Sequence, residues 1–236
     1  MSTEMQIGAA DTLTKLAAFR EIVHGRKSVR AYLPEPLSEG EICQLLELAS
    51  WSPSNCNTQP WRVHVVSGET LVRLREELLA DSLANGVSPD IPYNAKLYPP
   101  DLLSRMANHL NVQQLAFGIC REDEAARNKM RANNHSFFGA PHVLLLYLPA
   151  FANEREAADL GMFAQTFMLA LAAAGFAGVP QTSVGVYAAP VRRILQPTHD
   201  DKLMFAISFG REDPDASAGR LVQERCPVES FAVFHK

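Results

Sequence analysis

The sequence predicts a single domain that combines helices with a few buried strands, with helices in the majority. Two short apolar runs, residues 143–148 and 203–209, have the length and continuity of strands that are buried on both faces of a sheet. Residues 159–174 are apolar nearly all round, which favours a central buried helix. No linker-like stretch interrupts the chain, so we expect residues 12–236 to form one domain and residues 1–11 to be disordered.

The remaining elements of the first half follow from local signals. Residues 12–24 carry a loose apolar stripe with helical spacing. Ser38 and Glu41 have the spacing of a capping box, which predicts a helix that runs to about residue 49. Residues 62–66 are expected to form a strand and residues 70–84 a helix with mixed charge.

The second half has less regular patterns. Residues 85–100 are rich in turn formers and show no period, so we expect an excursion or lid. Residues 101–120 and 122–134 are expected to be polar helices, and Pro190 suits the first turn of a short helix. The apolar tail at 231–234 is suited to add an edge strand elsewhere, including on another subunit.

Composition excludes several classes of function. A net charge of −4 argues against a general nucleic-acid-binding protein. The four cysteines and seven histidines show no metal-ligand spacing, so we expect no metal site and reduced thiols in a cytoplasmic protein. The longest apolar stretch, residues 160–174, is too short to span a membrane and contains Gln165.

A basic cluster follows the first predicted helix. In an extended backbone Arg26, Ser28 and Arg30 share one face, because side chains alternate along a strand. Two guanidiniums and a hydroxyl on one face suit a phosphate group. Arg225 is a candidate third cation. A solvated basic patch remains an alternative for this cluster.

The loop at residues 51–61 places small and amide side chains between two tryptophans. Such a loop suits a flat heteroaromatic ligand that needs hydrogen bonds at its edge and an apolar wall. Cys56 is a candidate for a role in this loop, and a small buried residue is the favoured alternative. No glycine-rich phosphate loop, HExxH or GxSxG motif is present, so the sequence indicates neither a Rossmann site nor a protein nucleophile.

Four segments together resemble the FMN-dependent nitroreductase family. They are Arg-Lys-Ser-Val-Arg at 26–30, Ser-Pro-Ser-Asn-Cys-Asn-Thr-Gln-Pro-Trp at 52–61, Asn-His-Ser-Phe-Phe-Gly-Ala-Pro at 134–141 and Ala-Gly-Val-Pro-Gln-Thr-Ser at 177–183. The resemblance implies an α+β fold, with a central, mainly antiparallel sheet flanked by helices around a long buried helix. It also implies an intertwined homodimer that binds two FMN molecules at its interface, with the tail embracing the other subunit.

The resemblance also implies roles for individual residues. The phosphate and ribityl chain of FMN would be held by Arg26, Lys27, Ser28, Arg30 and Arg225. The partner's flavin would be reached by Pro53, Ser54, Asn55 and Asn57, with Gln59 in support. The ring near N5 would be lined by Pro180, Gln181, Thr182 and Ser183. One branch of the family has an acidic residue and a glycine in place of Thr182 and Ser183, so here a main-chain group or a hydroxyl would contact N5.

The substrate pocket is less defined. Asn111 and Gln114 are candidates to line it, together with the excursion at 85–100. Phe137 and Phe138 are candidates to stack on the substrate, and core packing is an equal alternative for both.

The implied activity is reduction of a small electron-poor aromatic compound, nitroaromatic or quinone-like, with NADH or NADPH as the reductant. Hydride would pass in two-electron, ping-pong steps through the flavin, so no catalytic side chain is expected. Reductive dehalogenation or ene reduction on the same scaffold is an alternative. A regulator that binds flavin or nucleic acid is the alternative outside enzymology.

Overall fold

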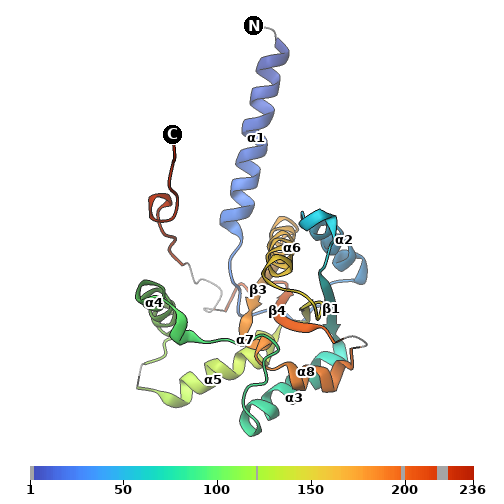
Figure 1. Ribbon diagram of the computed structural model, residues 1–236, viewed down its shortest axis with the longest axis vertical. Coiled ribbons are helices and arrows are strands. Elements are labelled where there is room, and N and C mark those ends of the chain that lie inside the picture. The colour runs from blue at the N-terminus through green and yellow to red at the C-terminus, as the bar shows by residue number, and fades with distance from the viewer. Residues whose placement is uncertain (1–2, 121, 198–199, 217–222) are drawn as a thin grey trace.

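The structure is a computed structural model that describes residues 3–120, 122–197, 200–216 and 223–236. These residues form an α+β fold around a four-stranded sheet (Figure 1). The strands are β1 (Arg62–Ser67), β2 (His142–Leu148), β3 (Ala177–Gln181) and β4 (Lys202–Gly210). They lie in the order β1-β2-β4-β3, and every neighbouring pair is antiparallel.

Two helices precede β1, and helices separate each pair of strands that are consecutive in sequence. In the described residues they are α1 (Thr3–Gly25), α2 (Glu39–Ser50), α3 (Gly68–Ala84), α4 (Pro100–Ala116), α5 (Glu124–His135), α6 (Glu154–Ala173), α7 (Thr182–Gly185) and α8 (Ala188–Leu195). Short 3₁₀ turns are η1 (Asn55–Asn57), η2 (Ala95–Leu97), η3 (Phe137–Gly139) and η5 (Val228–Ser230). None of the helices in the described part of the chain is long and apolar enough to cross a membrane.

The central strand β2 separates two hydrophobic cores. Leu144, Leu146 and Leu148 pack with α2 and α6 on one face, whereas Val143, Leu145 and Tyr147 pack with α3 and α8 on the other. Figure 1 shows these two pairs of helices on opposite sides of the sheet. Every residue of β2 is buried. The prediction of a strand buried on both faces is therefore confirmed.

The predicted caps are also present. The Ser38 side chain accepts a hydrogen bond from the Glu41 N–H at 3.2 Å, and Glu41 Oε2 accepts one from the Ser38 N–H at 2.7 Å. The helix α6 begins at Glu154, upstream of the expected residue 159, because Asn153 and Glu156 form a second capping box. One face of α6 is buried against the sheet, and the other exposes Met162 and Gln165 in the single chain.

Both termini extend away from the body of the molecule (Figure 1). The helix α1 begins at Thr3, so it includes residues 3–11 that the sequence led us to expect as disordered. Large apolar side chains are exposed along α1 and in the tail: Leu13, Leu16, Phe19, Val23, Phe231, Val233 and Phe234. The described tail, residues 223–236, contains the η5 turn and no strand, so an edge strand on another subunit stays a prediction.

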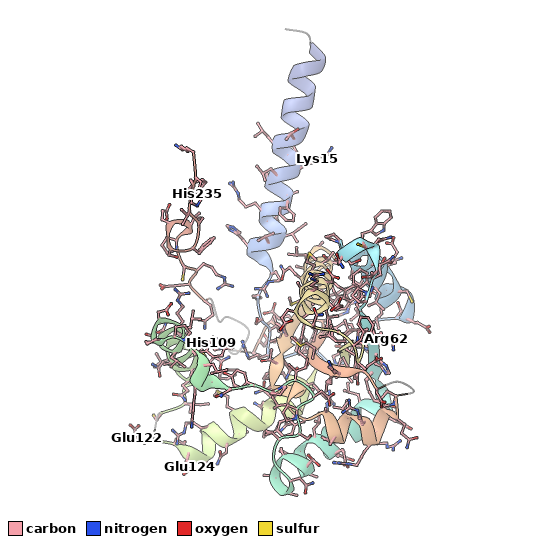
Figure 2. The ribbon with its side chains drawn as sticks, viewed as in Figure 1. Lys15, Arg62, His109, Glu122, Glu124 and His235 are labelled. Carbon is pink, nitrogen blue, oxygen red and sulfur yellow. The ribbon has the colours of Figure 1, made fainter. Side chains whose placement is uncertain are left out.

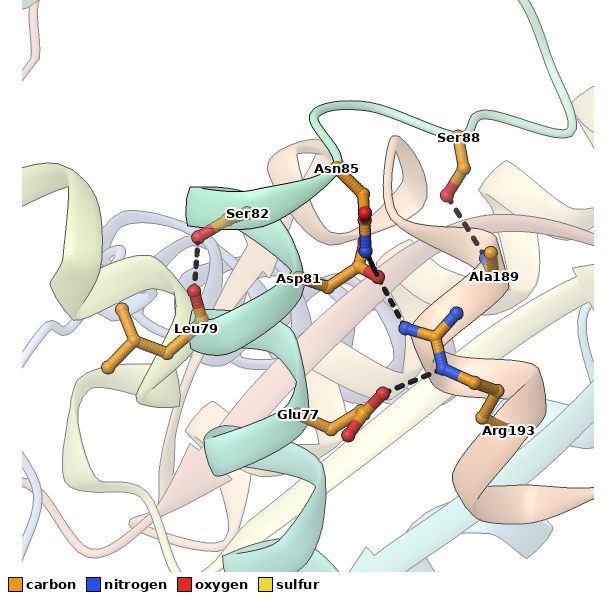
Figure 3. A network of polar contacts seen from close by, with 8 residues as sticks. All are labelled: Glu77, Leu79, Asp81, Ser82, Asn85, Ser88, Ala189 and Arg193. Atoms are coloured by element: carbon orange, nitrogen blue, oxygen red, sulfur yellow. Dashed lines mark hydrogen bonds and ion pairs between the residues drawn. The ribbon is translucent and has the colours of Figure 1, made fainter.

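The expected excursion at 85–100 contains the η2 turn and a β-bridge from Ser88 to Tyr187, and its last residue, Pro100, opens α4. Its start is fixed to α8, where the Ala189 N–H donates to Ser88 Oγ at 3.1 Å. Figure 3 shows Arg193 of α8 bonded to Glu77 and Asp81 of α3, with Asn85 on the same Asp81 carboxylate. Further along, Asp90 accepts two hydrogen bonds of 2.7 Å from Arg192. The first part of the excursion is therefore held by charged contacts.

A buried histidine joins β2 to the segment before α2. His142 is 2% exposed, and its Nε2 accepts a hydrogen bond of 2.8 Å from the Leu37 N–H. Nε2 therefore carries no proton, and Nδ1 donates to Ser67 Oγ at 2.5 Å. Burial lowers the pKa of His142, and the weaker effect of Glu41 raises it.

This arrangement predicts a loss of stability in acid. Below about pH 6.5 the unfolded chain binds the proton that folded His142 excludes, so the free energy of unfolding falls by up to about 1.4 kcal/mol per pH unit. Urea unfolding at fixed protein concentration, at about pH 7.5 and about pH 5.5, measures this slope. His142→Gln should have a smaller slope than the wild type. An equal slope in both proteins would mean that other groups account for the acid sensitivity.

Candidate functional site

A basic cavity of about 490 Å³ lies where the chain leaves α1. Beyond Gly25 the backbone is extended, and Ser28 forms a parallel β-bridge with Gly178 of β3. Alternation along this segment buries Val29 completely in a small core. The cavity's charged and polar lining consists of His24, Arg26, Lys27, Ser28, Arg30, His109, Gln223 and Arg225. The predicted convergence of Arg26, Ser28 and Arg30 is present.

The cations of this cavity are crowded and partly dehydrated. The pKa of Arg26 is lowered by burial and then by the neighbouring Arg225, and burial likewise lowers the pKa of Arg30. Arg225 therefore joins the cluster from the tail. Lys27 lies at the cavity wall in an ion pair of 2.6 Å with Glu212, so its charge is partly compensated. Such a concentration of positive charge favours a bound anion.

Gln223 adds a donor to the same cavity. Its Nε2 atom is buried and has no hydrogen-bond partner among the residues that the structure describes. A buried amide donor without a partner is unfavourable by about 1–3 kcal/mol, so an acceptor in the cavity would stabilise it. The donors available there, guanidinium, hydroxyl and amide groups, match the oxygens of a phosphate.

A second cavity of about 340 Å³ adjoins the first, because Arg30 and His109 line both. Its walls come from β3, α7, α4 and α5. The lining includes Leu110, Gln113, Phe117, Met130, Asn133, Asn134, Phe138, Val179, Pro180, Gln181, Thr182 and Ser183. Arg30 connects the two spaces: its Nη1 donates to Ser28 O at 3.1 Å, and its guanidinium lies 5.9 Å from the centre of the Phe138 ring.

The turn between β3 and α7 is fixed by side-chain hydrogen bonds. Gln181 Nε2 donates to Asn134 O at 2.9 Å, and Gln181 Oε1 accepts from Ser208 Oγ. Ser183 Oγ donates to Asn134 Oδ1 at 3.2 Å. All four of the predicted residues 180–183 line the second cavity. The side chain of Gln181, however, is buried and makes its hydrogen bonds inside the protein.

The two phenylalanines have different environments. Phe137 is completely buried in the core that contains Val143 and Leu145, and it lines neither cavity. Of the two alternatives for Phe137, stacking on substrate is therefore not supported by its position, and core packing is favoured. Phe138 lies in the wall of the second cavity.

The loop at residues 53–59 lies apart from both cavities in this chain. The Asn55 N–H faces both carboxylate oxygens of Asp159, at 3.2 and 3.1 Å, and Ser54 Oγ accepts from the Gln59 N–H at 2.9 Å. Asn57 and Gln59 have positive φ angles of 57° and 48°, which are uncommon for residues other than glycine. The loop is therefore held in a defined shape with its side chains exposed. Cys56 is exposed, contrary to the expectation of a buried residue.

The predicted place of Asn111 and Gln114 in the substrate pocket is not supported by their position, because neither residue lines the first or the second cavity. Both line a separate cavity of about 630 Å³ at the end of α4. The residues of α4 that line the second cavity are His109, Leu110 and Gln113, and the first and last of these lie one helical turn apart (Figure 2 labels His109). Sequence reasoning missed all three, although the i, i+4 spacing of His109 and Gln113 was a visible signal. The described residues contain no cluster of ligands that could hold a metal ion.

Comparison with known proteins agrees with this geometry. The family model described as "Nitroreductase family" matches residues 23–211. The nitroreductase NfnB of Mycolicibacterium smegmatis is 37% identical over 95% of this chain and 96% of its own length. The 4-nitrobenzoate reductase of Pseudomonas putida is 30% identical over 92% of this chain and 95% of its own length.

Solved structures give the same result. The crystal structure of FMN-dependent NfnB from Mycobacterium smegmatis in complex with NADPH has a TM-score of 0.90 and 35% identity, and covers 94% of this chain and 99% of that chain. The FMN- and NADPH-dependent NfnB from a Sphigopyxis strain has a TM-score of 0.88 and 29% identity, and covers 92% of this chain and 99% of that chain. Sequence, fold and site geometry agree, and the chain belongs to the nitroreductase family.

Proposed function

We propose that this protein is an FMN-dependent oxidoreductase that uses NAD(P)H to reduce small nitroaromatic compounds. The observation that carries the proposal is the pair of adjoining cavities, one basic and one lined by the β3–α7 turn. FMN has a matching division into a phosphate end and a flat ring end. The relatives named above are a nitroreductase and a 4-nitrobenzoate reductase, and others are chloronitrobenzene and nitrobenzene reductases.

The residues present fit FMN. Arg26, Arg30 and Arg225 would bind the phosphate, and Ser28 and the Nε2 atom of Gln223 would donate further hydrogen bonds. Lys27, paired with Glu212, would add to the positive field. The residues 180–183 would line the ring edge, where main-chain N–H groups and the hydroxyls of Thr182 and Ser183 are available donors.

FMN, when bound, supplies the redox chemistry by taking up hydride from the nicotinamide and passing it to the acceptor. The protein's part is to orient and to stabilise charge. Arg30, between the two cavities, places positive charge beside the ring end, where it favours negative charge on the ring. Phe138 and His109 line the second cavity and would form part of the wall beside that end.

The choice of reductant and acceptor rests on the relatives. Structures of two related enzymes are described as NADPH complexed or NADPH dependent, so we propose NADPH as the preferred reductant.

A nucleic-acid-binding role is disfavoured because Arg26 and Arg30 are partly buried in a cavity and do not form an open basic face. The free, exposed cysteines support the proposal of a cytoplasmic location.

Reconstitution of the purified chain with FMN tests this function. We expect tight binding of FMN, reduction of the bound flavin by NADPH under anaerobic conditions, and rapid reoxidation by 4-nitrobenzoate. A halophenol and an enone, tested as acceptors in the same assay, show whether the protein instead catalyses reductive dehalogenation or ene reduction. The proposal fails if the chain binds no FMN, or if the reduced protein is reoxidised by neither nitroaromatics nor quinones.

We also propose that the protein is an intertwined homodimer. The exposed apolar residues of α1 and of the tail are not covered by any element among the described residues, and exposed apolar patches of this kind mark association surfaces. The loop at 53–59, with its fixed shape and exposed amides, would then complete the ring end of the partner's site through Pro53, Ser54, Asn55 and Asn57, with Gln59 in support.

Hybrid dimers test this arrangement. We expect Arg30→Ala and Asn57→Ala homodimers each to bind FMN weakly at both sites. A hybrid with one subunit of each kind should contain one intact site, because Arg30 of the second subunit and Asn57 of the first both remain. Differently tagged subunits, co-purified and titrated with FMN, should therefore bind one FMN per dimer with wild-type affinity. Two weakened sites per hybrid would show that each site is built from a single chain.

A further inference from the structure

We propose that Ser208 and Gln181 are positioning residues that fix the distance between the phosphate end and the ring end of the flavin site. The inference rests on the proposed function, since it assumes that FMN occupies both cavities. It differs from the role that family resemblance implies for Gln181, a direct contact with the flavin, because the side chain of Gln181 is directed away from the cavity and into the sheet.

The hydrogen-bond partners of Gln181 determine which atom of its amide is the oxygen and which is the nitrogen. The amide is 3% exposed at the end of β3, directly before α7. The backbone carbonyl of Asn134 only accepts hydrogen bonds, so the Gln181 atom 2.9 Å away must be the Nε2 donor. Oε1 then faces Ser208 and accepts the hydrogen of its hydroxyl. The amide thus joins α5 to β4 through the ring-side turn.

Ser208 also connects to the phosphate end. It is completely buried on β4, where it pairs with Val179 of β3. Its carbonyl oxygen lies 3.1 Å from the hydroxyl of Tyr32, which lies 2.9 Å from the carbonyl oxygen of Val29. Burial raises the pKa of Tyr32 well above its usual value, so the hydroxyl keeps the proton that it shares between the two carbonyls.

Val29 lies between Ser28 and Arg30, the residues that face the basic cavity. One residue of β4 therefore holds both ends of the site: its side chain fixes the ring-side turn, and its carbonyl fixes the phosphate-side segment through Tyr32. Buried hydrogen bonds of this kind are costly to leave half made, so they rigidify the groups that they join.

The physical consequence concerns ligands that bridge both ends. FMN gains affinity over a phosphate ion because its two ends bind together, and this gain depends on the spacing of the two half-sites. A loosened link should leave each half-site able to bind its own group. The loss should therefore appear in FMN affinity and in the ring environment, but not in the affinity for inorganic phosphate.

The experiment compares Ser208→Ala and Gln181→Met with Ser67→Ala. The control also removes a hydroxyl that takes part in a hydrogen bond within the sheet, here with His142. Unlike Gln181, Ser67 lines neither cavity. For the two test variants we expect FMN to bind about 10-fold more weakly and the visible circular dichroism of bound flavin to change. Inhibition of FMN binding by inorganic phosphate should be unchanged. Ser67→Ala should lower the melting temperature alone.

The outcomes separate this inference from the proposed function. If the wild type binds FMN and the folded test variants match Ser67→Ala in FMN affinity and flavin dichroism, the two residues are merely structural and the inference is wrong. Equal weakening of FMN and of phosphate would also overturn it, since the half-site itself would then be damaged. A wild type that binds no FMN would instead contradict the proposed function. Gln181→Met keeps the side-chain volume, so it provides the comparison if Ser208→Ala does not fold.

Discussion

Replacement of both Arg26 and Arg30 by alanine is expected to weaken FMN binding by at least about 100-fold. Hydrogen bonds to charged groups contribute about 1.5–3 kcal/mol each, and every 1.4 kcal/mol corresponds to a factor of ten in affinity. Both side chains line the basic cavity, and burial lowers the pKa of each. Arg225 lowers the pKa of Arg26 further, so a bound phosphate would relieve the repulsion between these two guanidiniums.

Titration with FMN and with riboflavin measures this effect. Riboflavin lacks the phosphate, so the double variant should bind it about as well as the wild type does. Arg73→Ala, which removes an exposed arginine on α3, provides the matched control and should bind FMN normally. An unchanged FMN affinity in the double variant would show that the phosphate of FMN does not bind in this cavity. The basic cluster would then be a solvated patch.

Gly185→Ala is expected to destabilise the protein strongly and to disrupt the ring-side cavity. A Cβ atom at Gly185 would lie 2.2 Å from the backbone oxygen of Met204 and 3.0 Å from its carbonyl carbon. Backbone of a central strand does not yield, so α7 must move away from β4. Because α7 carries Thr182 and Ser183, the wall of the second cavity moves with it. Overpacking of this kind lowers the free energy of unfolding by about 1–3 kcal/mol, and by more where backbone is the obstacle.

Thermal unfolding and FMN titration together test this prediction. Gly40→Ala is the control, because a Cβ atom there meets nothing within 4 Å and the residue lies in the first turn of α2. The control should gain up to about 1 kcal/mol from the higher helix propensity of alanine. If Gly185→Ala retains wild-type stability and FMN affinity, α7 does not need its close contact with β4.

Much of the fold was predictable because its signals are local. The apolar runs of β2 and β4, of which the second is interrupted by Ser208, and the capping box of Ser38 each depend on residues close in sequence. The convergence of Arg26, Ser28 and Arg30 followed from strand alternation alone. The start of α1 was missed because residues 3–11 carry no strong apolar period, and the start of α6 was missed because its capping box precedes the apolar run.

The sequence by itself determined the family and the cofactor class, and it predicted the residues of the phosphate end, since these depend on short motifs with fixed spacing. The tertiary structure alone decided which distant residues join them. It brought Arg225 beside Arg26, placed His109 in both cavities, buried Phe137 and turned the amide of Gln181 toward Ser208. These contacts depend on the packing of helices onto two faces of one sheet, and no local pattern encodes which residues such packing brings together.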